Sequence, residues 1–265
     1  MFEAVRIAAT GLRHQQMRID TISDNLANAN TMGHKAARLD FKDALYTAGI
    51  IPGHPYTPEG DQQKGHGVIL SAVTRDFERQ GSLIETGHEL DFAIAGKGFF
   101  ELSDAFGNVV YTRAGNFYSA GGEGGMRYLV ASNGYYVLDE DGQRIEIPEG
   151  TTVVSVLQDG TVYFRGAVDA DGQAAETSVR LGMYTFANET GLYSIGNGNY
   201  SESEVSGDRM ADGVGTIMQG FLEGSNVNLA SEFTRMIRTQ RAFQLASRAL
   251  STADEMEGIA NNIRR

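Results

Sequence analysis

Apolar residues recur every seven positions at both ends of this chain. A seven-residue apolar repeat is typical of helices that pack along one another. We therefore predict that residues 1–34 and 227–265 form an N-terminal and a C-terminal helix that pair as a coiled coil. The eight side chains expected at the helical and subunit interface are Val5, Leu12, Ile19, Leu26, Leu229, Met236, Phe243 and Leu250.

The middle of the chain has a different pattern. Of the 33 glycines, 30 lie from Gly49 to Gly224, as do all four prolines. Short runs rich in β-branched and aromatic residues, among them Val179 to Phe186, alternate there with turn signals such as Gly107-Asn108 and Asp159-Gly160. Such turns favour hairpins, so we predict an antiparallel all-β domain over residues 85–200 and an α+β multidomain fold for the whole chain.

Two connecting segments complete this organisation. Residues 35–84 are predicted to be an extended linker, and residues 201–226 a return linker to the C-terminal helix. Within the first, Thr47 to Gly67 shows neither helical nor strand periodicity. It is interpreted as a long loop or as a segment that orders against a partner, and a plain flexible connector remains open.

The first helix is expected to end near a run of asparagine, threonine and glycine. Asparagine and glycine tolerate the left-handed conformation that terminates helices, and short polar side chains bond to nearby backbone. This helix-exit motif comprises Asn25, Asn28, Thr31 and Gly33. At the other end of the chain, Ser225 to Asn228 offers N-cap candidates and Glu232 suits the positive helix start.

Charge and composition exclude several partners. The net charge is −12, with +1 over residues 1–45, +2 over residues 226–265 and −15 between them, so nucleic acid is not an expected partner. No run approaches the roughly 20 apolar residues of a membrane span, and no secretory signal is expected. Cysteine is absent, which excludes disulfides and suits either a cytosolic protein or one exported unfolded.

Catalytic and ligand-binding patterns are also lacking in the sequence. The five histidines form no pair at metal-ligand spacing, and Gly96-Lys97-Gly98 lacks the spacing of a phosphate-binding loop. The acidic turn at Asp139 to Gly142 has its glycine too early for a calcium loop. We predict no cofactor, no metal and no enzymatic activity. An enzyme with an all-β catalytic domain and a surface-binding, adhesin-like β domain with oligomerising ends remain alternatives.

Six stretches of the sequence carry a family resemblance. They are Asn25 to Lys35 with Arg38 and Phe41, Leu90 to Phe100, Tyr111 to Phe117, Gly215 to Asn228, Thr239 to Phe243 and Ala249 to Met256. Together they resemble the flagellar basal-body rod and hook protein family, most of all its distal rod members. The resemblance implies a structural subunit that passes unfolded through the flagellar export apparatus and self-associates, with other rod and hook subunits, into a hollow helical drive shaft of the basal body. A proximal rod or other hook–basal-body paralogue is the alternative within the family.

Overall fold

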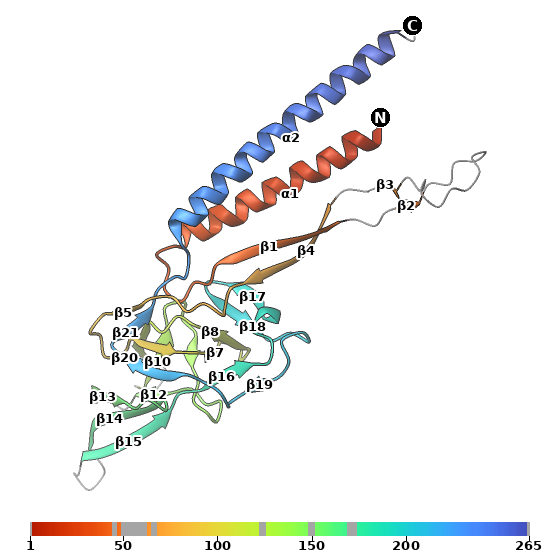
Figure 1. The fold of residues 1–265 in the computed structure, drawn as a ribbon. Helices are drawn as coiled ribbons and strands as arrows, with labels where there is room; N and C mark the ends of the chain where they lie inside the picture. The colour runs from red at the N-terminus through yellow and green to blue at the C-terminus, as the bar shows by residue number, and fades with distance from the viewer. Residues whose placement is uncertain are drawn as a thin grey trace. The chain divides into compact units, whose positions relative to one another are not determined.

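The chain folds into two compact units, each built from segments far apart in the sequence (Figure 1). This computed structural model describes residues 2–43, 47–48, 63–64, 68–121, 126–147, 152–168 and 174–263. The helical unit comprises Met1–Ala27, Ala37–Thr74 and Asn228–Arg265, and the β unit comprises Asn28–Ala36 and Arg75–Val227. The α+β class, with a helix at each end of a mostly antiparallel β region, is confirmed.

The helical unit is dominated by two long helices that pack against each other. Helix α1 (Phe2–Ala27) and helix α2 (Leu229–Ile263) run antiparallel, and the end of α1 lies beside the start of α2 (Figure 1). The predicted cap is Asn228, whose Oδ1 accepts a 3.0 Å hydrogen bond from the Ser231 backbone N–H. This bond satisfies one of the free amides at the helix start.

Two small sheets belong to the same unit. Strand β1 (Ala37–Asp43) pairs with β4 (Val68–Arg75), and β2 (Thr47–Ala48) pairs antiparallel with β3 (Gln63–Lys64). Beyond β2 and β3, the loop predicted from Thr47 to Gly67 lies outside the described residues.

The β unit contains seventeen described strands. They are β5 (Leu83–Glu85), β6 (Phe92–Ala95), β7 (Phe99–Ser103), β8 (Val109–Thr112), β9 (Phe117–Gly121), β10 (Arg127–Ala131), β11 (Tyr136–Val137), β12 (Glu146–Ile147), β13 (Thr152–Val156), β14 (Thr161–Val168), β15 (Ala174–Arg180), β16 (Met183–Phe186), β17 (Tyr193–Gly196), β18 (Asn199–Ser201), β19 (Arg209–Met210), β20 (Thr216–Gln219) and β21 (Phe221–Glu223), with a short 3-10 helix, η2, at Glu189–Gly191. The largest sheet has the order β12-β10-β11-β7-β8-β18-β17, with β9, β16 and β19 joined to its side, and β13-β14-β15 form a separate sheet.

Turn chemistry predicted two hairpins of this unit correctly. Gly107-Asn108 lies between β7 and β8, and Asp159-Gly160 lies between β13 and β14. The run predicted from Val179 to Phe186 is instead divided between β15 and β16. Gly182 lies between them, and its backbone is close to Asp139, whose carbonyl oxygen would be 2.7 Å from an added Cβ.

Strands continue beyond residue 200, into the segment expected to be a return linker. There β20 pairs with β6, and β21 pairs with β5. The runs Thr216–Gln219 and Phe221–Glu223 are too short to show a clear two-residue period, and they were not among the predicted strands. The β unit is therefore completed by residues that immediately precede α2 in the chain.

Strand β7 separates two clusters of buried side chains. All five of its residues are buried, and successive side chains point to opposite faces. Phe100 packs edge-on against Phe117, with ring centroids 5.3 Å apart, in one cluster, while Phe99 packs against Tyr200 in the other. This central position explains why the Phe-Phe-Glu-Leu run does not alternate between apolar and polar residues.

Candidate functional site: a helical pair and a buried charge cluster

The predicted interface side chains of α1 lie along the helical pair. Val5, Leu12, Ile19 and Leu26 are half-buried, and Ile22 is the most enclosed apolar residue of the helix at 5% exposure. These residues sit three, four or seven positions apart, which places them on one face. Their role in contacts between subunits remains a prediction.

The predicted α2 set is divided. Met236, Phe243 and Leu250 are half-buried, whereas Leu229 is 46% exposed. A strict seven-residue repeat drifts by about 20° per heptad around a straight helix, so Leu229 lies about 60° from Leu250. The first member of the set has therefore turned away from the paired face.

Sequence reasoning missed two buried members of that face, Glu232 and Thr239. Ala246 and Ala253 follow Glu232 and Thr239 at intervals of seven residues. This second seven-residue repeat was the sequence signal that could have identified Glu232 and Thr239 as members of the paired face. The Glu232 Oε1 accepts a 2.7 Å hydrogen bond from Arg235 Nη1. Its Oε2 is buried without a hydrogen-bond partner among the described residues.

A second apolar surface of α2 is exposed. Leu229, Phe233 and Ile237 follow one another at four-residue spacing and are 46%, 53% and 52% exposed. Leu245, which is 65% exposed, lies on the same row eight residues after Ile237, with the exposed Arg241 at the position between them. Side chains at four-residue spacing form a continuous ridge on a helix, so we call these four residues the outer ridge of α2.

The helix-exit residue Asn25 anchors the end of α1 to β1. Its amide donates a 2.9 Å hydrogen bond to the Ala37 carbonyl, and its Oδ1 accepts a 2.8 Å bond from the Ala37 N–H. Asn25 is only 1% exposed, so the two bonds satisfy polar groups that water cannot reach.

The other exit residues form a turn in the β unit. Thr31 Oγ1 donates to Asn28 Oδ1 at 3.2 Å, a bond between two side chains where a bond to the backbone was expected. Gly33 has a φ of +69°, and its N–H donates a 2.7 Å hydrogen bond to the Glu223 carbonyl. An added Cβ at Gly33 would lie 2.5 Å from the Ala114 nitrogen. Gly33 thus permits close contact between chain segments and does not itself end α1.

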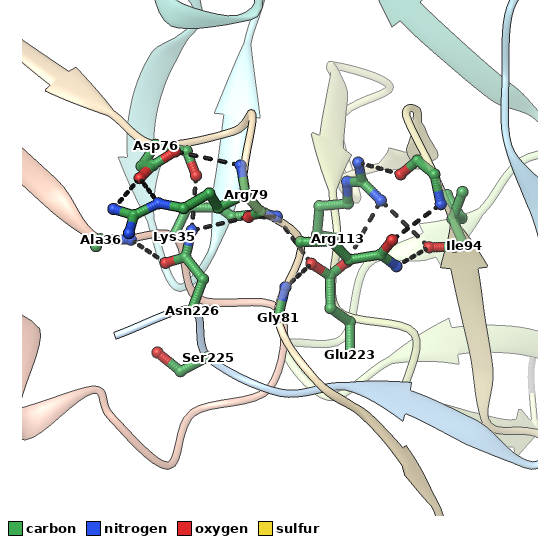
Figure 2. Close-up of polar contacts among 12 residues, drawn as sticks. Lys35, Ala36, Asp76, Arg79, Gly81, Ile94, Arg113, Glu223, Ser225 and Asn226 are labelled. Carbon is green, nitrogen blue, oxygen red and sulfur yellow. Dashed lines mark hydrogen bonds and ion pairs between the residues drawn. The ribbon is translucent and has the colours of Figure 1, made fainter. Parts of the chain in front are cut away.

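A buried cluster of three charged side chains lies beside this turn (Figure 2). Lys35 Nζ is 2.8 Å from Glu223 Oε1, and Arg113 Nη1 is 3.3 Å from Glu223 Oε2. Each of these side chains is at most 2% exposed. Burial lowers the pKa of Lys35 and of Arg113, and in both cases the Glu223 carboxylate opposes that shift.

Backbone groups complete the charge cluster. Lys35 Nζ also donates to the Arg79 carbonyl at 3.0 Å, Arg113 Nη2 donates to the Gly96 carbonyl at 2.8 Å, and the Gly81 N–H donates to Glu223 Oε1 at 3.0 Å. One carboxylate thus faces two cations, and polar backbone atoms share the remaining contacts.

Asn226, in the segment that precedes α2 in the sequence, adds three further hydrogen bonds near this cluster (Figure 2). Its Nδ2 donates to the carbonyls of Asp76 and Arg79 at 2.7 and 2.9 Å, and its Oδ1 accepts a 2.8 Å bond from the Ala36 N–H. The segment that follows α1 and the segment that precedes α2 are therefore fixed side by side in the β unit.

Lys35, Arg113, Glu223 and Asn226 were not singled out as site residues. Each nevertheless lies inside a stretch that carries the family resemblance, and three such stretches meet at this cluster. A separate lysine, arginine and glutamate give no signal in the sequence because only the fold brings them together.

Neither site offers chemistry beyond packing and charge neutralisation. Among the described residues, no three His, Asp or Glu side chains are grouped as metal ligands. In the same part of the chain, no helix has the length and apolar character to cross a membrane. A pair of terminal helices with an exposed apolar ridge, in a chain whose β unit is built from distant segments, is typical of structural proteins that assemble from many copies.

Comparisons with known proteins agree with this class. Residues 5–35 match the model described as flagella basal body rod protein, residues 93–164 match the flagellar hook protein FlgE/F/G D1 domain, and residues 218–263 match the flagellar basal body rod FlgEFG protein C-terminal. The chain is 38% identical to the flagellar basal-body rod protein FlgG of Agrobacterium fabrum over 97% of this chain and 98% of that protein. It is 37% identical to FlgG of Bacillus subtilis over the full length of both chains.

A third relative is more distant. The flagellar hook-basal body complex protein FlhP of Bacillus subtilis is 31% identical, again over the full length of both chains. The chain belongs to the flagellar basal-body rod protein family and is a structural subunit of the basal-body rod.

Proposed function

We propose that this subunit polymerises through its terminal helices into the distal part of the rod, a hollow helical shaft that transmits torque to the hook. The observation that carries the proposal is the outer ridge of α2. Because α1 covers the opposite face of that helix, Leu229, Phe233, Ile237 and Leu245 remain 46–65% exposed among the residues that the structure describes. A helix with apolar residues on two faces is typical of an element that becomes buried on both sides, and lateral contact between copies supplies the second cover.

The distal position is supported by the order of similarity within one organism. The chain is 37% identical to FlgG of Bacillus subtilis but 31% identical to FlhP, over the full length in both cases. The FlhP relationship keeps another hook–basal-body subunit as the second candidate.

Location, partners and lack of catalysis complete the proposal. The subunit passes through the flagellar export apparatus and assembles outside the cytoplasm, in the periplasm or cell-wall space, with other rod and hook subunits. A chain without cysteine suits this route because it cannot form a disulfide during transfer. We infer a non-enzymatic role, which is supported by the mutual neutralisation of Lys35, Arg113 and Glu223 in the β unit.

Two aspartate substitutions test the outer ridge. Phe233→Asp places a charge on the exposed ridge without touching the face that packs on α1, whereas Phe243→Asp places one inside the helical pair. We expect both variants to abolish incorporation into basal bodies and motility. Leu26→Asp should act like Phe243→Asp.

Thr234→Asp is the matched control, because Thr234 is exposed and adjacent to Phe233 but lies off the ridge. Incorporation should be measured by immunoblotting of purified basal bodies from cells that carry each variant as their only copy. Normal incorporation of Phe233→Asp would disprove the role of the ridge. A wild-type chain absent from the basal body would disprove the proposed function as a whole.

A further inference from the structure

A groove lies between α1, β1 and the first turns of α2 in the helical unit. Its volume is about 480 Å³, and all of its lining residues belong to this unit. Ile22, Leu39 and Phe41 provide its apolar floor. A groove of this size accommodates several side chains of a docked segment.

Four arginines line the groove: Arg18, Arg38, Arg235 and Arg238. Only two carboxylates accompany them. Asp40 is 3.6 Å from Arg38, and Glu232 binds Arg235 through Oε1. The groove therefore has an excess of positive charge, although the chain as a whole is acidic.

The second carboxylate oxygen of Glu232 adds an independent signal. The side chain is 5% exposed, it lines the groove, and its Oε2 has no hydrogen-bond partner among the described residues. A buried carboxylate oxygen without a donor is destabilising, so a ligand that supplies one is favoured.

The C-terminal part of α2 has the complementary properties. Helix α2 has 35 residues and α1 has 26, so α2 is longer by about 13 Å and extends past the start of α1 (Figure 1). Asp254 and Glu255 are exposed there, as are Met256 at 57% and Ile259 at 59%. Asn262 is also exposed and carries amide donors of the kind that Glu232 Oε2 lacks. We call residues 254–263 the α2 overhang.

We propose that the α2 overhang of one copy docks into the arginine-lined groove of the next copy, which joins subunits end to end. This inference rests on the proposed polymerisation and names the surfaces that make its axial contact. The carboxylates of Asp254 and Glu255 meet the arginines, and Met256 and Ile259 cover the apolar floor. The groove and the overhang lie at opposite ends of the antiparallel pair, so each copy offers one of each to its neighbours. A head-to-tail contact of this kind uses two different surfaces, and where its rotation does not close a ring it builds an open helical filament.

Site-directed crosslinking tests the contact directly, because the chain has no cysteine of its own. Cells should co-express two variants, Thr21→Cys in the groove and Met256→Cys in the overhang, one of them carrying a size tag. Each chain then has a single thiol, so any disulfide joins two copies. After mild oxidation of purified basal bodies, we expect a mixed dimer on a non-reducing gel only when both variants are present.

Ser23→Cys replaces Thr21→Cys in the control, because Ser23 is an exposed residue of α1 outside the groove. A mixed dimer no more abundant with Thr21→Cys than with Ser23→Cys, while all chains are incorporated, would overturn the docking proposal and leave the rod function standing. If the wild-type chain itself were absent from basal bodies, the proposed function would fail instead.

Charge exchange gives a second measurement that needs no thiol. Arg238→Glu and Asp254→Arg each remove one ion pair of the contact and should each lower the amount of incorporated subunit about fivefold. The combined variant exchanges these two charges, so the lost pair is restored and the amount of incorporated subunit should increase above that of either single variant. Arg13→Glu is the control, since Arg13 is an exposed residue of α1 that lies outside the groove and is not part of the outer ridge of α2. No recovery in the combined variant, or an equal loss with Arg13→Glu, would contradict docking at this groove.

Discussion

Lys35 and Glu223, which are 188 residues apart in the sequence, form a 2.8 Å ion pair with each side chain only 1% exposed. One follows the first helix and the other precedes the last. Their contact requires the β unit to fold around both, because Glu223 is also held by the Gly81 N–H and by Arg113. The pair therefore links the segment that follows α1 to the segment that precedes α2 within the β unit.

Removal of the shared carboxylate is expected to destabilise the β unit strongly. Glu223→Ala leaves Lys35 and Arg113 buried as uncompensated cations, which typically costs about 3–5 kcal/mol. Urea unfolding followed by tyrosine fluorescence measures this loss. Glu85→Ala is the control, because Glu85 is exposed and lies on β5, the strand that pairs with β21. This substitution should lower the free energy of unfolding by less than about 0.5 kcal/mol. Equal effects of the two substitutions would show that the cluster contributes little.

A methyl group at Gly33 should be far more costly than the same group at another glycine with positive φ. Gly33 (φ +69°) faces Ala114, whereas an added Cβ at Gly134 (φ +83°) meets nothing within 4 Å. We expect Gly134→Ala to cost about 1 kcal/mol from backbone strain alone, and Gly33→Ala at least about 3 kcal/mol. Thermal unfolding of the two variants gives the comparison. Similar melting temperatures would contradict the close approach of Gly33 to Ala114.

Loss of the Asn25 side chain should loosen the junction of α1 and β1. Asn25→Ala leaves the buried N–H and C=O of Ala37 without partners, which costs about 1–3 kcal/mol for each group. Hydrogen exchange of the Ala37 amide should accelerate accordingly. Ser23→Ala, an exposed position of the same helix, should leave that exchange rate unchanged. Unaltered protection in Asn25→Ala would disprove the anchoring role.

Two buried tyrosines predict loss of stability at alkaline pH. Burial raises the pKa of Tyr111, helped by its hydrogen bond to Glu202, and burial also raises the pKa of Tyr200. Unfolded tyrosines ionise near pH 10, so the folded state holds more protons above that pH. Their stabilising contribution is complete below pH 10 and decreases as the pH rises above it. Lys35 acts in the opposite direction, because burial lowers its pKa and the unfolded chain binds the extra proton.

Tyr200→Phe should therefore make the decrease in unfolding free energy between pH 10 and pH 11 shallower, while Tyr118→Phe, at an exposed position, should not. Urea unfolding at each pH, with tyrosinate absorbance as the readout, measures the slope. The same slope in wild type and Tyr200→Phe would rule out a contribution from this tyrosine.

The terminal helices are expected to depend on assembly. Most of the predicted interface side chains of α1 and α2 are only half-buried, and the outer ridge of α2 is exposed. Apolar burial within a single free copy is therefore too small to offset the conformational entropy lost when two long helices become ordered. Circular dichroism of a dilute monomer should show less helix than 26 and 35 residues would give, and helicity should increase with concentration. Full helicity at high dilution would contradict this prediction.

The sequence alone determined the large elements and their order. The seven-residue repeats identified both helices, and Gly107-Asn108 and Asp159-Gly160 located two hairpins, because these signals depend on local backbone preferences. Strands β20 and β21 escaped prediction because these short segments are specified by their pairing partners, β6 and β5.

Tertiary structure alone decided which residues make the sites. Leu229 is exposed and Glu232 is buried on the face of α2 that packs against α1. The reason is that residues seven positions apart drift by about 20° per repeat around a straight helix, so they do not all stay on one face. The tertiary structure also brought Lys35, Arg113 and Glu223 together from three distant segments. Ion pairs between residues far apart in sequence leave no periodic pattern, since the energy of such a contact depends on distance in space and on burial rather than on spacing along the chain.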